Sequence, residues 1–130
     1  MNISSEITAI EAWTLLNSNI NYTLVDVRTN EEMVSCGSPK LAGKVIRIPS
    51  HTGSLMLQNP DFVKELENTV QHKDQNLIFI CRSNGRSKIA KLAAEKAGYK
   101  NCYIVLDGYM GSESGIGWLN SKLPYEIVKA

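Results

Sequence analysis

The chain has 130 residues, of which 43% are hydrophobic and 21% are charged, and its formal net charge is +1. This length suits one domain with a sizeable core, and this composition excludes a collagen-like or a disordered chain. No apolar run approaches the roughly 18 residues of a membrane span, and nearly balanced charges give no overall field that would attract nucleic acid. We therefore predict a single domain over residues 1–130 that binds neither a membrane nor nucleic acid.

The N-terminus and the cysteines indicate a cellular context. Residues 1–6 are polar and acidic, unlike the basic and then apolar start of a targeting segment, so we expect a cytoplasmic protein. The three cysteines, Cys36, Cys81 and Cys102, contain no Cys-x-x-Cys pair. An odd number without such a pair favours single thiols over a disulfide framework or a zinc site. We expect no metal and no cofactor.

In the first half of the chain, two capping boxes predict where helices begin: Thr8 with Glu11, and Thr29 with Glu32. The predicted elements, in order, are a helix from Thr8 to about residues 17–19, a strand at 22–27, a short helix after Thr29, a strand at 44–48, a loop at 50–59 and a helix with Asn59 as N-cap and Pro60 as first residue.

The second half continues the same alternation. Its predicted elements are a strand at 77–80, a helix at 87–97 closed by Gly98, a strand at 102–106, a glycine-rich loop at 107–117 and a short helix at 118–121. Alternating strands and helices favour parallel strands joined by right-handed crossovers. The sequence predicts an α/β fold with a central parallel sheet of about five strands and helices on both faces.

We expect the chemistry in the loop after the apolar strand 77–80, since open α/β sheets bind ligands beyond the carboxyl ends of their strands. A cysteine between a strand and a helix N-terminus receives backbone N–H groups and the positive end of the helix dipole, which favour a nucleophilic thiolate. Arginines in the same loop suit a tetrahedral or sulfonate-like anion, and a glycine permits a tight turn. The loop is Cys81-Arg82-Ser83-Asn84-Gly85-Arg86-Ser87.

Several motifs occur in order over most of the chain. They are Leu24-Val25-Asp26-Val27-Arg28 followed by Glu32, Ile80-Cys81-Arg82-Ser83-x-x-Arg86-Ser87, Ala93-x-x-x-x-Gly98-Tyr99, Leu106-Asp107-Gly108, Trp118 and Leu123-Pro124. In these motifs the chain resembles the rhodanese, or thiosulfate sulfurtransferase, family in its single-domain form. The resemblance implies that Cys81 takes sulfane sulfur from thiosulfate or a persulfide donor, holds it as a persulfide and passes it to a thiol or cyanide. It also implies that the residues from Arg82 to Ser87 form the substrate cradle, and a protein persulfide is a further candidate partner.

The chain departs from the family pattern at two places. Asn84 stands where the family often has glycine, and Gly85 follows it, so the turn has a different shape at the same loop length. The segment 107–117 is longer and richer in glycine and serine than the Gly-Gly turn common in the family, which affects access for the acceptor.

Other residues have weaker assignments. Arg86 is predicted to bind the anion or to brace the loop, whereas Arg82 faces substrate or solvent. Asp26 and Arg28 are expected to form a structural ion pair. Cys102 is predicted to lie in the core, and participation of Cys36 or His51 stays open.

Two other functions remain open. One is a rhodanese-like sulfur-carrier or regulatory binding module, although the retained Cys81 argues against lost chemistry. The other is a phosphatase or arsenate reductase, which needs a Cys-x5-Arg loop, whereas Cys81 to Arg86 gives Cys-x4-Arg. The sulfur donor, the acceptor, the pathway and the oligomeric state do not follow from the sequence.

Overall fold

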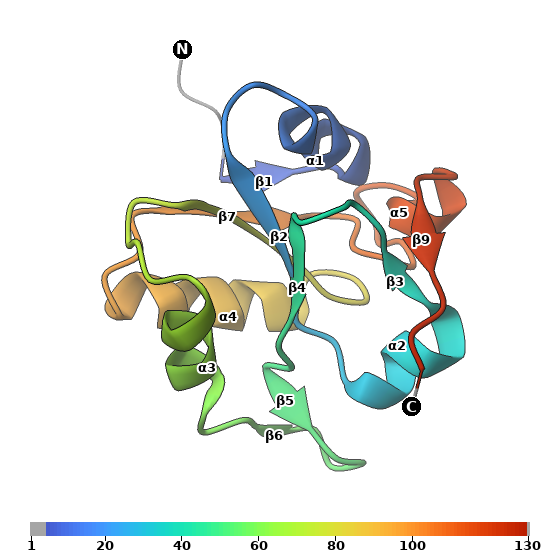
Figure 1. Cartoon of the computed structure of the whole chain (residues 1–130). Helices are drawn as coiled ribbons and strands as arrows, with labels where there is room; N and C mark the ends of the chain where they lie inside the picture. Colours follow the sequence, from blue (N-terminus) through green and yellow to red (C-terminus); the bar gives the residue numbers. More distant parts are fainter. Residues whose placement is uncertain (1–4, 130) are drawn as a thin grey trace.

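The computed structural model describes residues 5–129, so residues 1–4 of the predicted non-targeting N-terminus lie outside it. The central sheet has five parallel strands in the order β1-β8-β7-β2-β4 (Figure 1). These strands are β1 (Glu6–Ile7), β2 (Tyr22–Asp26), β4 (Val45–Arg47), β7 (Asn76–Ile80) and β8 (Asn101–Val105). The predicted α/β fold with a parallel sheet is confirmed.

Helices cover both faces of the sheet (Figure 1). Their bounds are α1 (Ala9–Leu16), α2 (Asn30–Cys36), α3 (Phe62–Thr69), α4 (Gly85–Lys96) and α5 (Gly117–Asn120). The helices α3 and α4 pack on one face, and α1 and α5 pack on the other. None of the helices in residues 5–129 is long and apolar enough to cross a bilayer.

The central position of β7, covered on both faces, explains why its sequence is an unbroken apolar run. Leu77 and Phe79 face the core under α3 and α4, whereas Ile78 and Ile80 face the core under α1 and α5. Successive side chains of a strand point to opposite faces, so a strand covered on both sides needs apolar residues at every position. Because β7 is the middle strand of the five, its carboxyl end and the following Cys81 lie at the middle of the sheet edge.

Both predicted capping boxes form. The Thr8 hydroxyl accepts the Glu11 N–H at 3.2 Å while the Glu11 carboxylate accepts the Thr8 N–H at 2.8 Å. Thr29 and Glu32 make the equivalent pair at 3.2 Å and 3.1 Å. Each box supplies partners for N–H groups that the first turn of a helix leaves unpaired.

Two predicted helix starts are wrong by a few residues. The helix α3 begins at Phe62 with Asp61 as its N-cap, because Asn59 forms a turn that accepts the Asp61 N–H at 3.1 Å and donates to the Pro49 carbonyl at 2.9 Å. The helix α4 begins at Gly85 instead of Ser87. The first turn of α4 therefore belongs to the cysteine loop itself.

Short strands that the sequence did not predict complete the structure. The segment 50–59, predicted as a loop, contains the hairpin of β5 (His51–Thr52) and β6 (Leu57–Gln58). A second antiparallel pair joins β3 (Ser38–Pro39) to β9 (Tyr125–Glu126) near the C-terminal end. Strands of two residues are too short to show an alternating pattern, so only pairing in the folded chain defines them.

Candidate active site

Cys81 lies directly after β7 and directly before the turn into α4. Its Sγ accepts the backbone N–H of Ser87 at 3.4 Å, and the side chain is 1% exposed. The sulfur therefore receives a donor from the first turn of α4, where the helix dipole favours negative charge. The Ser87 hydroxyl is buried and has no hydrogen-bond partner within the described residues, so the first turn of α4 holds a further donor that is not used.

The backbone of the 107–117 loop runs against the cysteine loop. The N–H of Tyr109 donates to the Cys81 carbonyl at 2.8 Å, and the N–H of Met110 donates to the Arg82 carbonyl at 3.0 Å. Gly108 has φ +61°, and a Cβ there would lie 2.3 Å from the Ser83 carbonyl oxygen. Only glycine combines this left-handed backbone with so close an approach.

Side chains anchor these two loops. The Asn84 amide donates to the Leu106 carbonyl at 2.9 Å, so the residue that departs from the family pattern ties the cysteine loop to the end of β8. The Asp107 carboxylate accepts the N–H of Ala9 at 2.8 Å and that of Gly117 at 2.9 Å. These are the first residues of α1 and α5, so Asp107 fixes the loop to two helix N-termini.

Arg86 is held by Glu32 in a two-pronged ion pair, with N–O distances of 2.5 Å and 2.8 Å. Burial acts to raise the pKa of Glu32, but hydrogen bonds from Arg86 and Thr29 outweigh it and lower this pKa to about 2. The hydrogen bond to Glu32 is the largest cause that raises the pKa of Arg86, and the charge of Cys81 adds to it. Arg86 therefore joins α2 to the cysteine loop in a bracing position.

Asp26 and Arg28 form the expected ion pair, with Nη2–Oδ2 at 2.8 Å and Nε–Oδ1 at 3.0 Å. Both side chains are buried. The guanidinium also donates to the Gly37 carbonyl at 2.6 Å and lies 3.9 Å from the ring centroid of Tyr109, while Ser38 donates to Asp26 at 2.7 Å. This network fixes the C-terminal end of α2 beneath the site.

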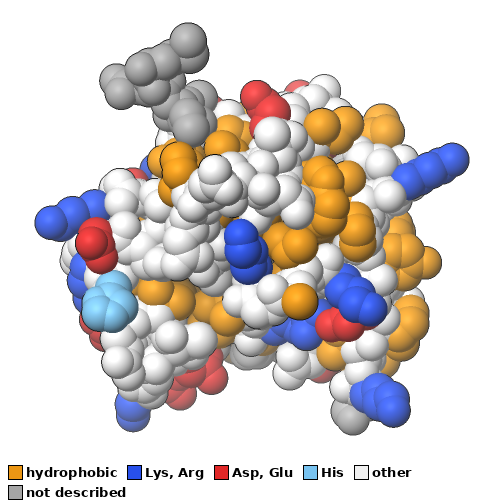
Figure 2. Space-filling model, turned by 45° about the horizontal axis from the view of Figure 1, so that its top comes forward, with side chains coloured by type: hydrophobic (Ala, Val, Ile, Leu, Met, Phe, Trp, Pro, Cys, Tyr) orange, Lys and Arg blue, Asp and Glu red, His pale blue; other side chains and the backbone are white. Residues whose placement is uncertain are grey.

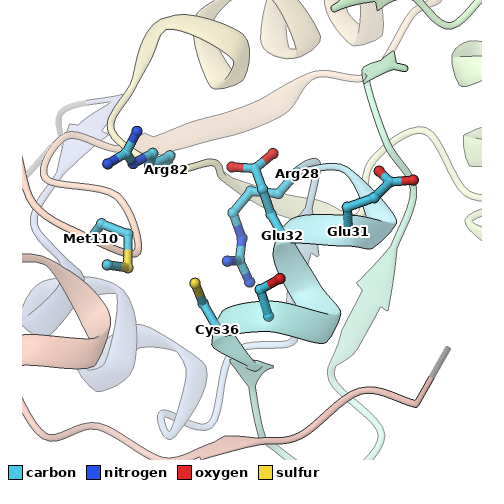
Figure 3. A pocket seen from close by; sticks show the side chains of 7 residues that line it. Arg28, Glu31, Glu32, Cys36, Arg82 and Met110 are labelled. Atoms are coloured by element: carbon cyan, nitrogen blue, oxygen red, sulfur yellow. The ribbon is translucent and has the colours of Figure 1, made fainter. Parts of the chain in front are cut away.

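A cavity of about 280 Å³ opens between α2 and the cysteine loop (Figure 3). Its lining residues are Arg28, Glu31, Glu32, Ser35, Cys36, Arg82 and Met110. The side chains of Cys36 and Met110 reach toward the open space in Figure 3, and Arg82 enters from the cysteine loop. The cavity borders the loop at both ends, through Arg82 itself and through Glu32, the partner of Arg86.

The structure separates the remaining candidates. Cys36 lines the cavity, whereas Cys102 is buried in the core and burial raises its pKa to about 11. His51 is buried, with Nδ1 at 2.8 Å from the Ser50 hydroxyl, and burial and the charge of Arg86 lower its pKa. The sequence analysis missed Glu31, Ser35 and Met110 as lining residues, because no local sequence pattern marks residues of these types as belonging to a site.

Charged side chains of both signs are spread over the face seen in Figure 2. Within residues 5–129 no group of three or more His, Cys, Asp or Glu side chains is arranged to hold a metal ion. The described site brings together the thiols of Cys81 and Cys36, backbone hydrogen-bond donors and the guanidinium groups of Arg28, Arg82 and Arg86.

A family model described as the STR4 middle domain matches residues 5–130. An uncharacterized protein of Rickettsia conorii is 40% identical over 124 residues, which are 93% of this chain and 96% of that protein. Among solved structures, Rv0390 from M. tuberculosis has 32% identity and a TM-score of 0.84, covering 98% of this chain and all of that one. The polysulfide-sulfur transferase homodimer of Wolinella succinogenes has 20% identity and a TM-score of 0.69, with 93% and 77% covered, and supports the fold alone.

We predict that Gly108→Ala destabilises the protein more than Gly43→Ala. Both glycines have positive φ, so each alanine costs about 1–2 kcal/mol of backbone strain. Only at position 108 does the new Cβ meet backbone carbonyls, and overpacking adds about 1–3 kcal/mol. Urea unfolding measures both losses, and equal losses would show that the contact between the two loops does not constrain the fold.

We also predict an acid-sensitive brace. The folded pKa of Glu32 lies below its ordinary value of 4.5, so its contribution to stability is complete above that pH and is lost as pH falls toward about 2. Glu32→Gln should therefore lower the unfolding free energy at neutral pH and flatten its decline between about pH 5 and pH 3. Glu31→Gln removes a carboxylate from the same helix turn without breaking the ion pair, and it should keep the wild-type decline. If the wild type and Glu32→Gln decline in parallel, Glu32 does not stabilise the brace.

Proposed function

The chain belongs to the STR4 middle domain family, a rhodanese-like family, and we propose that it is a sulfurtransferase that carries sulfane sulfur as a persulfide on Cys81. The donor is thiosulfate or a persulfide, the acceptor is a thiol or cyanide, and the protein acts in the cytoplasm. The observation that carries the proposal is the N–H of Ser87 at 3.4 Å from the Cys81 Sγ, in the first turn of α4.

The first half of the reaction loads the cysteine. The Cys81 thiolate attacks the outer sulfur of thiosulfate, a new S–S bond forms, and the original S–S bond breaks. Sulfite leaves with the electron pair of that bond. The extra sulfur then lies about 2.05 Å beyond Sγ and carries the negative charge.

The second half of the reaction removes the outer sulfur from Cys81. An acceptor thiolate attacks the outer sulfur of the persulfide, and the Cys81 thiolate leaves with the electron pair of the S–S bond. A thiol acceptor becomes a persulfide and cyanide becomes thiocyanate. No external oxidant or reductant enters either half.

Three features of the site support this chemistry. The helix N-terminus favours an anionic sulfur before and after loading. The uncommitted Ser87 hydroxyl supplies a further donor in the same residue whose N–H binds Sγ. The 1% exposure of Cys81 suits a nucleophile that reacts with a small sulfur atom and is shielded from bulkier electrophiles.

The two loop arginines have different roles in this proposal. Arg82 is exposed and lines the cavity, so it contacts the sulfonate oxygens of the donor. Arg86 is committed to Glu32, so it stabilises the loop and the charge on Cys81.

We predict that thiosulfate adds the mass of one sulfur atom to the protein and that cyanide removes it with formation of thiocyanate. Cys81→Ser should gain no sulfur, because its hydroxyl is a far weaker nucleophile than a thiolate. Cys36→Ser and Cys102→Ser are matched controls that should still load. Intact-protein mass spectrometry and a thiocyanate assay measure these results, and sulfur gained by Cys81→Ser would overturn the assignment. A phosphoester substrate should give no turnover, as the Cys-x4-Arg loop is one residue short for phosphate.

The arginine roles predict different kinetic defects. Arg82→Ala should raise KM for thiosulfate about fivefold with kcat nearly kept, as expected for one partly exposed contact of about 1 kcal/mol. Arg86→Ala leaves the Glu32 carboxylate without its ion-pair partner and removes the positive charge that acts on Cys81, so it should lower kcat and the unfolding free energy together. Arg86→Lys should recover only part of both, because lysine lacks the two-pronged geometry. The assignment of the two roles fails if Arg86→Ala changes KM alone and Arg82→Ala changes kcat alone.

A further inference from the structure

The cavity beside the cysteine loop contains one uncommitted charge of each sign. Arg28 is paired with Asp26, and Glu32 is paired with Arg86. Within residues 5–129 the side chains of Arg82 and Glu31 have no hydrogen-bond or ion-pair partner, and both are exposed in the cavity lining. These two side chains are free to bind a ligand.

The two free charges lie on opposite sides of the cavity. Arg82 extends from the cysteine loop, and Glu31 belongs to the first turn of α2, on the far side in Figure 3. A dianion such as thiosulfate satisfies Arg82 but is repelled by Glu31. A ligand with a carboxylate at one end and an ammonium group at the other satisfies both.

The rest of the lining suits a sulfur-bearing ligand of small size. The half-buried thiol of Cys36 and the thioether of Met110 give the cavity a soft, polarizable wall. The volume of about 280 Å³ lies at the lower limit of small-molecule pockets, which begin at roughly 300 Å³. A ligand of one to a few amino-acid residues matches this size.

We propose that this cavity binds the sulfur acceptor and that the acceptor is a small zwitterionic thiol, with its carboxylate on Arg82 and its ammonium group on Glu31. This inference rests on the proposed function of Cys81 as the sulfur carrier. The donor and the acceptor use Arg82 in turn, because sulfite leaves before the acceptor enters. Glu31 attracts the ammonium group of the acceptor, whereas it repels thiosulfate.

The transfer then needs no additional group. The bound thiolate attacks the outer sulfur of the Cys81 persulfide, the S–S bond to Cys81 breaks, and Cys81 leaves as a thiolate. The acceptor departs as a zwitterionic persulfide. Cys81 does not itself line the cavity, but its neighbour Arg82 does, so the acceptor thiolate reaches the outer sulfur from the Arg82 side of the cavity.

The test uses three peptides that differ only at their ends: Gly-Cys-Gly, its N-acetylated form and its C-terminal amide. Wild type, Glu31→Gln and Arg82→Gln are loaded with thiosulfate and freed of excess donor. Loss of one sulfur atom is then followed by mass spectrometry in a single turnover. Asp74→Asn and Lys100→Gln serve as charge-matched controls, since these exposed residues lie near the amino ends of β7 and β8, at the opposite edge of the sheet.

For the wild type, blocking either end should slow unloading about two- to fivefold, the range expected for exposed ion pairs, and the difference should shrink at high salt. Glu31→Gln should remove the penalty of acetylation and keep the penalty of amidation. Arg82→Gln should do the reverse, and the two control variants should keep both penalties. The ratio of variant to wild-type rates is taken for each peptide separately, so that the intrinsic reactivity of its thiol cancels.

The inference is overturned if blocking the peptide ends leaves the wild-type rate unchanged, or if Glu31→Gln alters the rates of all three peptides equally. Failure of the wild type to load contradicts the proposed function instead. In that case calorimetry with S-methylated Gly-Cys-Gly and the unloaded protein decides the binding site. Binding that Glu31→Gln and Arg82→Gln each weaken about two- to fivefold supports the cavity as a zwitterion site, and absence of such binding rejects it.

Discussion

The backbone of Gly108, Tyr109 and Met110 runs in direct contact with the backbone of the cysteine loop, and the geometry of the site depends on this contact. Two N–H groups of this segment bind the carbonyls of Cys81 and Arg82, and the absence of a Cβ at position 108 lets the chains approach. With its carbonyls fixed in this way, the loop turns the N–H of its helical end toward Sγ. The segment is itself fixed through Asp107 to the first residues of α1 and α5. The position of the cysteine loop therefore depends on how α1 and α5 pack on one face of the sheet.

Charge pairing around the cysteine has a second consequence. The buried Asp26–Arg28 pair lies just before α2, and the half-buried Glu32–Arg86 pair joins α2 to α4. Each pair neutralises a charge that would otherwise be costly near the core. Once these four side chains are committed to one another, the electrostatic character of the cavity is set by the few charges that remain. Of the two loop arginines, the fold therefore commits Arg86 to Glu32 and leaves Arg82 free in the cavity lining.

Much of the fold could be predicted because its signals are local. The capping boxes of α1 and α2 lie within four residues, and the apolar run of β7 is contiguous. Alternation of strands and helices then implied the parallel sheet, and the position of a cysteine between β7 and α4 indicated a site at the carboxyl edge. The start of α3 was wrong because Asn59 had a competing use for its side chain, as the anchor of a turn to Pro49. Either use fits the local sequence, and only the folded chain, which brings the Pro49 carbonyl within reach of Asn59, decides between them.

The sequence by itself determined the α/β class, the place of Cys81 and the ordered motifs of the cysteine loop, because these depend on residues that are neighbours in the chain. The tertiary structure alone decided that Arg86 pairs with Glu32, 54 positions away, that Gly108 lies against Ser83, and that Arg82 and Glu31 face a shared cavity. The physical reason is that a charge or a carbonyl is satisfied by whatever lies within a few ångströms of it. That distance is set by how the sheet and helices pack, and the order of residues along the chain does not record it.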